Sequence, residues 1–121
     1  ALERAVNNLN ELSARVLTIS VGGSVRRIAL SSIISVESRS RKAHINCGDE
    51  IIEVYSTISQ LAKQLGGDFV CCHKSFLANM SRVKSMERGY FLMDSGEKVP
   101  ISQKKRAKTK EIFLNYIGEM L

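Results

Sequence analysis

The chain has 121 residues, enough for one domain with its own hydrophobic core and no need of disulfides or a metal. Its hydrophobic content of 44% is ordinary, and it shows neither an apolar run as long as a membrane span nor a secretory leader, so we expect a cytoplasmic protein without a membrane segment. The formal net charge of +6 favours an anionic partner, and a basic surface without such a partner is the alternative.

The first half of the chain is predicted to contain one helix followed by short strands. Apolar residues recur at helical spacing over residues 2–13, which indicates an amphipathic helix. Alternation and turn residues then indicate strands at five places: residues 15–21, 24–29, 33–38, 43–47 and 50–55. Gly22 with Gly23, and Gly48 with Asp49, are turn pairs that predict two hairpins.

The second half is predicted to contain a short helix, further strands and a terminal helix. Ser56 or Thr57 caps the short helix, and Gly66 ends it. Strands are expected at four places: from Phe69, and over residues 82–88, 90–93 and 98–102. Pro100 marks the last of these as an edge strand or a bulge. The terminal helix begins near Gln103 and carries an apolar stripe: Ile112, Phe113, Tyr116, Ile117 and Met120. The fold class is therefore mainly β with added α.

One strand is interrupted by polar residues in a way that indicates a surface tip. The run from Phe69 to Asn79 is apolar apart from His73, Lys74 and Ser75 at its centre. Because a buried polar group without a partner costs free energy, we expect this strand to reach the surface there.

The cations cluster in two places along the chain. The first cluster contains Arg39, Arg41 and Lys42. The second extends from Lys98 to Lys110 without an acidic residue. One-signed clusters favour contact with an anion over an ordinary solvated face.

Catalytic and metal-binding motifs are missing from the sequence. No phosphate-binding glycine loop occurs, and the spacing of Cys47, Cys71 and Cys72 with one histidine does not match the usual zinc sites. Cys72 and His73 are neighbours on a strand and therefore point to opposite faces, which argues against a thiol nucleophile. We expect no enzyme, no cofactor and no metal, and we expect free, inert cysteines, with oxidation near the polar tip as the alternative.

Several segments together resemble the LytTR DNA-binding domain family. The run from Phe69 to Asn79 matches its Phe-x-x-x-His-(Arg/Lys)-Ser-(Tyr/Phe)-x-x-Asn motif, and Gly96 to Ser102 matches its Gly-x-x-(Ile/Val)-Pro-(Val/Ile)-Ser motif. Two earlier segments agree in order, namely residues 34–38 and 53–61. The resemblance covers roughly residues 15 to 110.

The resemblance implies an elongated antiparallel β fold that acts as the output domain of a bacterial two-component response regulator. Residues 1–14 would be a residual linker helix after a receiver domain, and residues 15–121 the DNA-binding domain. Such domains insert loops into successive major grooves of double-stranded DNA at direct-repeat promoter sites, so we expect a homodimer on DNA.

Carried over by position, three loops would contact DNA. The first contributes Arg39, Arg41, Lys42 and His44; the second His73, Lys74 and Ser75; the third Gln103, Lys104, Lys105 and Arg106. Lys74, Gln103 and the loop of residues 39–44 would read bases, and the glutamine, often arginine in relatives, would suit adenine. Ser75 and the last three cations would hold phosphates.

Each of these assignments has a structural alternative. His73 is equally well explained as a residue that fixes the loop, and the first loop as a solvated turn. Asn79 is interpreted as a cap of its own backbone. Lys108 and Lys110 are interpreted as surface charge, and the aromatic residues as core: Tyr55, Phe69, Phe76, Tyr90 and Phe91.

Two other functions are alternatives to DNA recognition. One is a protein-interaction or membrane-surface-binding β domain that uses its basic face. The other is an RNA-binding module, which would need exposed aromatic residues. Because the cations fall in three separated loops, the sequence favours the grooves of a duplex.

Overall fold

The structure is a computed structural model that describes residues 16–120, so the helix predicted over residues 2–13 lies outside it. Ten strands are present: β1 Val16–Val21, β2 Ser24–Ala29, β3 Ser35–Arg39, β4 Lys42–Asn46, β5 Ile51–Val54, β6 Phe69–His73, β7 Phe76–Asn79, β8 Val83–Met86, β9 Tyr90–Met93 and β10 Lys98–Pro100. Two α-helices and three 3₁₀ turns connect or follow them: α2 Ile58–Leu65, α3 Arg106–Met120, η1 Leu30–Ser32, η2 Met80–Arg82 and η3 Gln103–Lys105. Along the described residues no helix is both long and apolar enough to cross a membrane.

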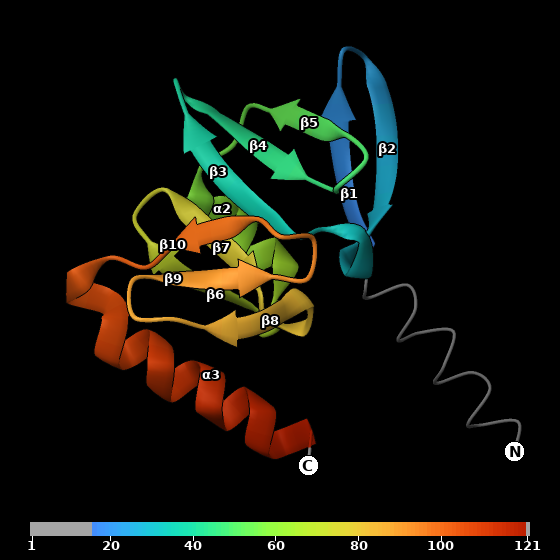
Figure 1. Ribbon diagram of the computed structural model, residues 1–121. Coiled ribbons are helices and arrows are strands. Elements are labelled where there is room, and N and C mark those ends of the chain that lie inside the picture. Colours follow the sequence, from blue (N-terminus) through green and yellow to red (C-terminus); the bar gives the residue numbers. More distant parts are fainter. Residues whose placement is uncertain (1–15, 121) are drawn as a thin grey trace, which may run out of the picture.

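The strands form three antiparallel sheets (Figure 1). The central sheet has five strands in the order β5-β4-β3-β7-β6, a second sheet has the order β10-β9-β8, and β1 and β2 form a separate hairpin. The predicted fold class, mainly β with added α, is confirmed. The central pairing of β3 with β7 joins two hairpins that are distant in sequence, with Val36 opposite Leu77.

Local sequence signals explain why the predicted hairpins and the short helix form. Gly22 and Gly23 have φ angles of 56° and 83°, which a two-residue hairpin turn of the primed type requires. The hydroxyl of Thr57 accepts the backbone N–H of Gln60, and the Gln60 side chain accepts the N–H of Thr57, so a capping box begins α2. These two predicted elements are confirmed.

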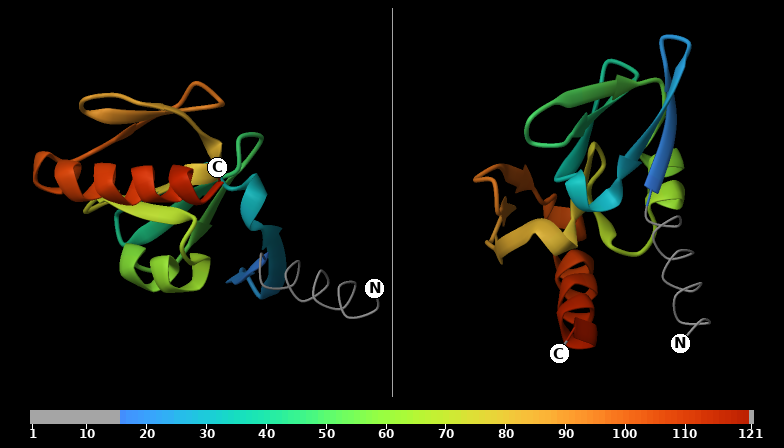
Figure 2. Two further views of the ribbon diagram at one scale, coloured as in Figure 1. Left: turned by 90° about the horizontal axis from the view of Figure 1, so that it is seen from below. Right: turned by 90° about the vertical axis from the view of Figure 1, so that its right-hand side faces the viewer.

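The central sheet has a hydrophobic core on each face. Along β6, Phe69 and Cys71 face a core shared with α2 and the β1–β2 hairpin, whereas Val70 and Cys72 face a core shared with α3 and the three-stranded sheet. This alternation is the period of a strand buried on both sides. Figure 2 accordingly shows α2 and α3 on opposite sides of the central sheet. Packing on both faces fixes the position of the central sheet, and with it the turns at the ends of its strands.

Some predicted boundaries and one predicted core residue are corrected by the structure. The strands predicted to start at residues 33 and 82 begin at Ser35 and Val83. Arg82 belongs to the 3₁₀ turn η2, and Ile33 follows η1 and donates its backbone N–H back to the Leu30 carbonyl oxygen. Pro100 ends β10 at the edge of its sheet, as predicted. Tyr55, predicted to be core, is 83% exposed, because it follows the last paired residue of β5.

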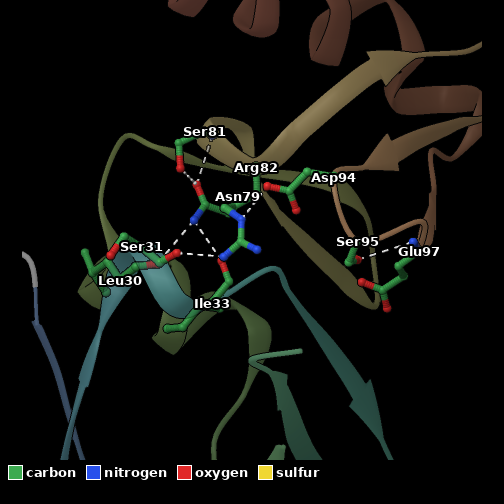
Figure 3. A network of polar contacts seen from close by, with 9 residues as sticks. All are labelled: Leu30, Ser31, Ile33, Asn79, Ser81, Arg82, Asp94, Ser95 and Glu97. Atoms are coloured by element: carbon green, nitrogen blue, oxygen red, sulfur yellow. Dashed lines mark hydrogen bonds and ion pairs between the residues drawn. The ribbon is translucent and has the colours of Figure 1, made fainter. Parts of the chain in front are cut away.

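A buried asparagine joins the two 3₁₀ turns that flank the sheets (Figure 3). Asn79 is 1% exposed, and its side-chain amide donates to the carbonyl oxygens of Leu30 and Ile33 at 3.2 and 2.8 Å. Its Oδ1 accepts the backbone N–H of Ser81 at 3.0 Å, which confirms that Asn79 caps its own backbone. Nearby, Arg82 donates to Asp94 Oδ2 at 2.7 Å and to the Ser31 carbonyl oxygen at 2.8 Å. These contacts tie the three-stranded sheet to the rest of the fold.

Candidate nucleic-acid interface

The three loops predicted from the sequence lie together at one end of the fold. The backbone N–H of Ser38, near the β3–β4 turn, donates to the carbonyl oxygen of Ser75 at 2.8 Å. The N–H of Ser102, before η3, donates to the carbonyl oxygen of Cys72 at 2.8 Å. The β6–β7 turn therefore lies between the other two segments, and Figure 1 shows all three along its left edge.

The first segment is a tighter turn than the sequence suggested. Arg39 and Lys42 are paired across β3 and β4, so only Ser40 and Arg41 form the turn. Their φ angles of 52° and 69° are positive, a conformation that usually selects glycine or asparagine. A side chain held in this region costs about 1–2 kcal/mol relative to the right-handed form. Arg41 is exposed and makes no ion pair among the described residues.

The other side chains of this segment have acidic partners that the sequence alone did not identify. Arg39 contacts Glu37 at 2.9 Å, while Lys42 and His44 approach the two carboxylate oxygens of Glu53 at 3.5 and 3.7 Å. The signal was present in the sequence, because residues on adjacent antiparallel strands face each other, here His44 opposite Glu53. Such exposed pairs contribute about 0–1 kcal/mol, so an anionic ligand can compete for the cations.

Lys42 has a further partner in the exposed ring of Tyr55. Its ammonium nitrogen lies 5.1 Å from the centre of that ring. This distance is in the range of a cation–π contact, which restrains the long side chain while leaving its charge accessible. Tyr55 therefore belongs to the surface around the first segment.

The second segment, at the β6–β7 turn, presents one free cation. His73 pairs with Phe76, so Lys74 and Ser75 form the turn. His73 Nδ1 accepts the backbone N–H of Ser75 at 3.1 Å, and its ring packs edge-on against Phe76 with the centroids 5.5 Å apart. Lys74 is exposed and has no ion pair among the described residues. The histidine thus holds the turn that carries Lys74.

The third segment is a helix start rich in positive charge. The Ser102 hydroxyl accepts the backbone N–H of Lys105 at 3.3 Å and begins η3, which continues into α3. No acidic residue lies in the first turn of either helix, so the positive end of the helix dipole is not neutralised. Gln103 and Lys104 are exposed, whereas Lys105 and Arg106 are half-buried. The Nε atom of Arg106 is buried without a hydrogen-bond partner.

The two cysteines near these segments are packed against the two cores. Cys72 is fully buried, its thiol donates to the carbonyl oxygen of Pro100 at 3.3 Å, and burial raises its pKa to about 12. Cys71 faces the other core, and its thiol donates to the carbonyl oxygen of His73 at 3.2 Å. Cys47, Cys71 and Cys72 are all free thiols. No three His, Cys, Asp or Glu side chains in the described part of the chain gather in a group that could hold a metal ion.

Comparison with known proteins identifies a family and a similar fold among solved structures. The family model described as the LytTr DNA-binding domain matches residues 23–114. Among solved structures, the chain is similar to the LytTr DNA-binding domain of a Bacillus cereus protein described as a methyl-accepting/DNA response regulator. The TM-score is 0.69 at 22% sequence identity, over 81% of this chain and 95% of that chain, so the likeness concerns the fold. No curated protein matched the chain.

Proposed function

Because the chain belongs to the LytTr DNA-binding domain family, we propose that it recognises a particular duplex DNA sequence and controls transcription as the output domain of a two-component response regulator. The observation that carries the proposal is the alignment of three segments along one end of the fold. Backbone hydrogen bonds of 2.8 Å join the β6–β7 turn to each of its neighbours, so the exposed cations are held at fixed positions. The proposal gives the chain no enzymatic step.

Within this proposal, base reading and phosphate binding belong to different residues. Lys74 and Gln103 are exposed on rigid turns, which suits contact with base edges in a major groove. The β3–β4 segment supplies the third reading element, with Arg41 at its tip. The cations from Lys104 to Arg106 lie at the helix start, where phosphate oxygens are favoured. Ser75, next to Lys74 in the β6–β7 turn, is a further phosphate ligand in this proposal.

The assembly on DNA follows from the resemblance and from the spread of the three segments. We propose that the segments enter successive major grooves and that two copies bind direct repeats as a homodimer. Residues 1–14 would be the end of a linker that follows a receiver domain, and residues 15–121 the DNA-binding domain. The similar Bacillus cereus domain, from a protein described as a response regulator, supports this arrangement.

Selection of binding sites from a random double-stranded DNA pool, repeated at two salt concentrations, tests the proposal. The expected result is an enriched pair of short direct repeats about one helical turn apart, bound less tightly at higher salt. The same selection with the Lys74→Ala variant should enrich the pair of direct repeats only weakly. Salt-sensitive binding without an enriched sequence would overturn sequence recognition and leave a basic face for a protein or a membrane surface.

A further inference from the structure

A fourth turn lies at the same end of the fold as the three predicted segments. The backbone N–H of Glu87 donates to the carbonyl oxygen of Tyr90 at 2.8 Å, so Arg88 and Gly89 form the tip of the β8–β9 hairpin. The carbonyl oxygen of Gly89 accepts the N–H of Ile101 at 2.9 Å. This bond places the tip against the strand that leads two residues later into Gln103. Figure 1 shows the β8–β9 turn next to the start of α3.

The side chains of this turn leave one positive charge available to a ligand. Arg88 is exposed, and among the described residues it makes no hydrogen bond or ion pair. The neighbouring carboxylate of Glu87 is turned back along the strand, where it accepts the Ser85 hydroxyl at 2.8 Å. A second cation lies close by, since the Lys98 ammonium group is 5.2 Å from the centre of the Tyr90 ring. The turn therefore adds positive charge beside the third segment.

We propose that Arg88 binds a DNA backbone phosphate next to the bases read by the Gln103 segment, as a fourth contact of the interface. This inference rests on the proposed function. The hydrogen bond from Ile101 to Gly89 holds the β8–β9 turn beside the Gln103 segment. An element that flanks a groove-reading segment meets the sugar-phosphate backbone that borders the groove. The planar guanidinium fork can donate two hydrogen bonds to the oxygens of one phosphate.

The test compares Arg88→Ala with the matched control Arg27→Ala. Arg27 lies on β2, is exposed and makes no ion pair among the described residues, and its hairpin is on the opposite side of the molecule from the four turns (Figure 1). Both variants lose one positive charge, so their difference isolates the local contact. Fluorescence anisotropy would measure the binding of each, and of wild type and Arg88→Lys, to a mixed-sequence duplex and to the duplex enriched by selection, over a range of salt concentrations.

We expect Arg88→Ala to bind both duplexes about threefold more weakly near physiological salt, with a slope of log affinity against log salt smaller by about 0.9. Arg27→Ala should retain the wild-type affinity and slope, and Arg88→Lys should recover most of the slope. Equal affinities and slopes for Arg88→Ala and Arg27→Ala, with wild type binding duplex tightly, would overturn the fourth contact alone. Failure of wild type to bind either duplex would overturn the proposed function and this inference together.

Discussion

At the scale of single residues, the most informative position is Arg41. Natural hairpins place glycine or asparagine where φ is positive, yet the β3–β4 turn uses Ser40 and Arg41 at 52° and 69°. Residues in strained backbone conformations cluster at functional sites, where the role of the side chain outweighs the loss of folding stability. Because no described residue pairs with Arg41, we infer that its side chain is reserved for a ligand.

Replacement of Arg41 by glycine should therefore change stability and DNA binding in opposite directions. Glycine relieves the left-handed strain but gains entropy when unfolded, so the free energy of unfolding should rise by roughly 0.5–1 kcal/mol. DNA affinity should fall, because one cation at the tip is lost. Urea denaturation and anisotropy measure the two effects. Unchanged DNA affinity would show that Arg41 does not contact DNA. A decrease in the free energy of unfolding would show that the backbone at Arg41 is not strained.

The two proposed base-reading residues should affect specificity rather than general affinity. Gln103→Ala should relax the preference at one base position by about 1–3 kcal/mol, and Lys74→Ala should weaken binding to the selected site much more than to a scrambled duplex. Lys110→Ala, which removes a surface charge further along α3, is the control. If Lys74→Ala weakens both duplexes equally, Lys74 binds phosphate and the base assignment is wrong.

Burial of Cys72 gives a prediction for alkaline pH. Desolvation is the main cause that raises its pKa from 9.0 to about 12, so the folded state keeps the proton that the unfolded chain loses. The free energy of unfolding should therefore decrease as the pH rises from about 9 to about 12. The Cys72→Ala variant should show a shallower decrease over this range. An identical pH dependence in both proteins would show that the thiol titrates freely.

At the scale of elements, sequence patterns predicted the hairpins and α2 but not the 3₁₀ turns between them. Turn pairs such as Gly22 with Gly23 act locally, and local chemistry can be read from the chain. By contrast, η1 depends on Asn79, whose amide reaches the carbonyl oxygens of Leu30 and Ile33 across the fold. A contact of that separation leaves no periodic signal in the sequence.

The Asn79 bridge should be among the most sensitive polar sites in the molecule. Asn79→Ala would remove the 2.8 Å donor to the Ile33 carbonyl oxygen, one of the two donors to the Leu30 carbonyl oxygen, and the acceptor of the Ser81 N–H. A buried polar group left without a partner costs about 1–3 kcal/mol. We expect a loss of at least about 2 kcal/mol in the free energy of unfolding. Asn115→Ala, at an exposed position of α3, should change it by less than about 0.5 kcal/mol. If both variants change the free energy of unfolding by a similar small amount, the hydrogen bonds of Asn79 do not contribute to stability as proposed.

At the scale of the whole molecule, the sequence predicts which residues form the candidate site but not how they are arranged. The resemblance identified His73, Lys74 and Gln103 as one group, whereas the order of the strands came only from the structure. Pairing of β3 with β7 brings the first segment beside the second, and the bond from Ser102 to Cys72 adds the third. The sequence did not single out the β8–β9 turn, because Arg88 directly follows the acidic Glu87. The position of this turn beside Gln103 depends on the hydrogen bond from the Ile101 N–H to the Gly89 carbonyl oxygen.

The arrangement of segments on two sheets requires that the two cores unfold together. Val70 and Cys72 face one core and Phe69 faces the other, so β6 cannot leave one core without disrupting both. Phe91→Ala in the core beside α3 should cost about 3–5 kcal/mol, and Leu61→Ala in the core beside α2 about 2–5 kcal/mol. Each variant should keep a single urea transition, coincident by circular dichroism and by tyrosine fluorescence. Two separated transitions in Phe91→Ala would show that the three-stranded sheet unfolds alone, and that the spacing between Lys74 and Gln103 is adjustable rather than fixed.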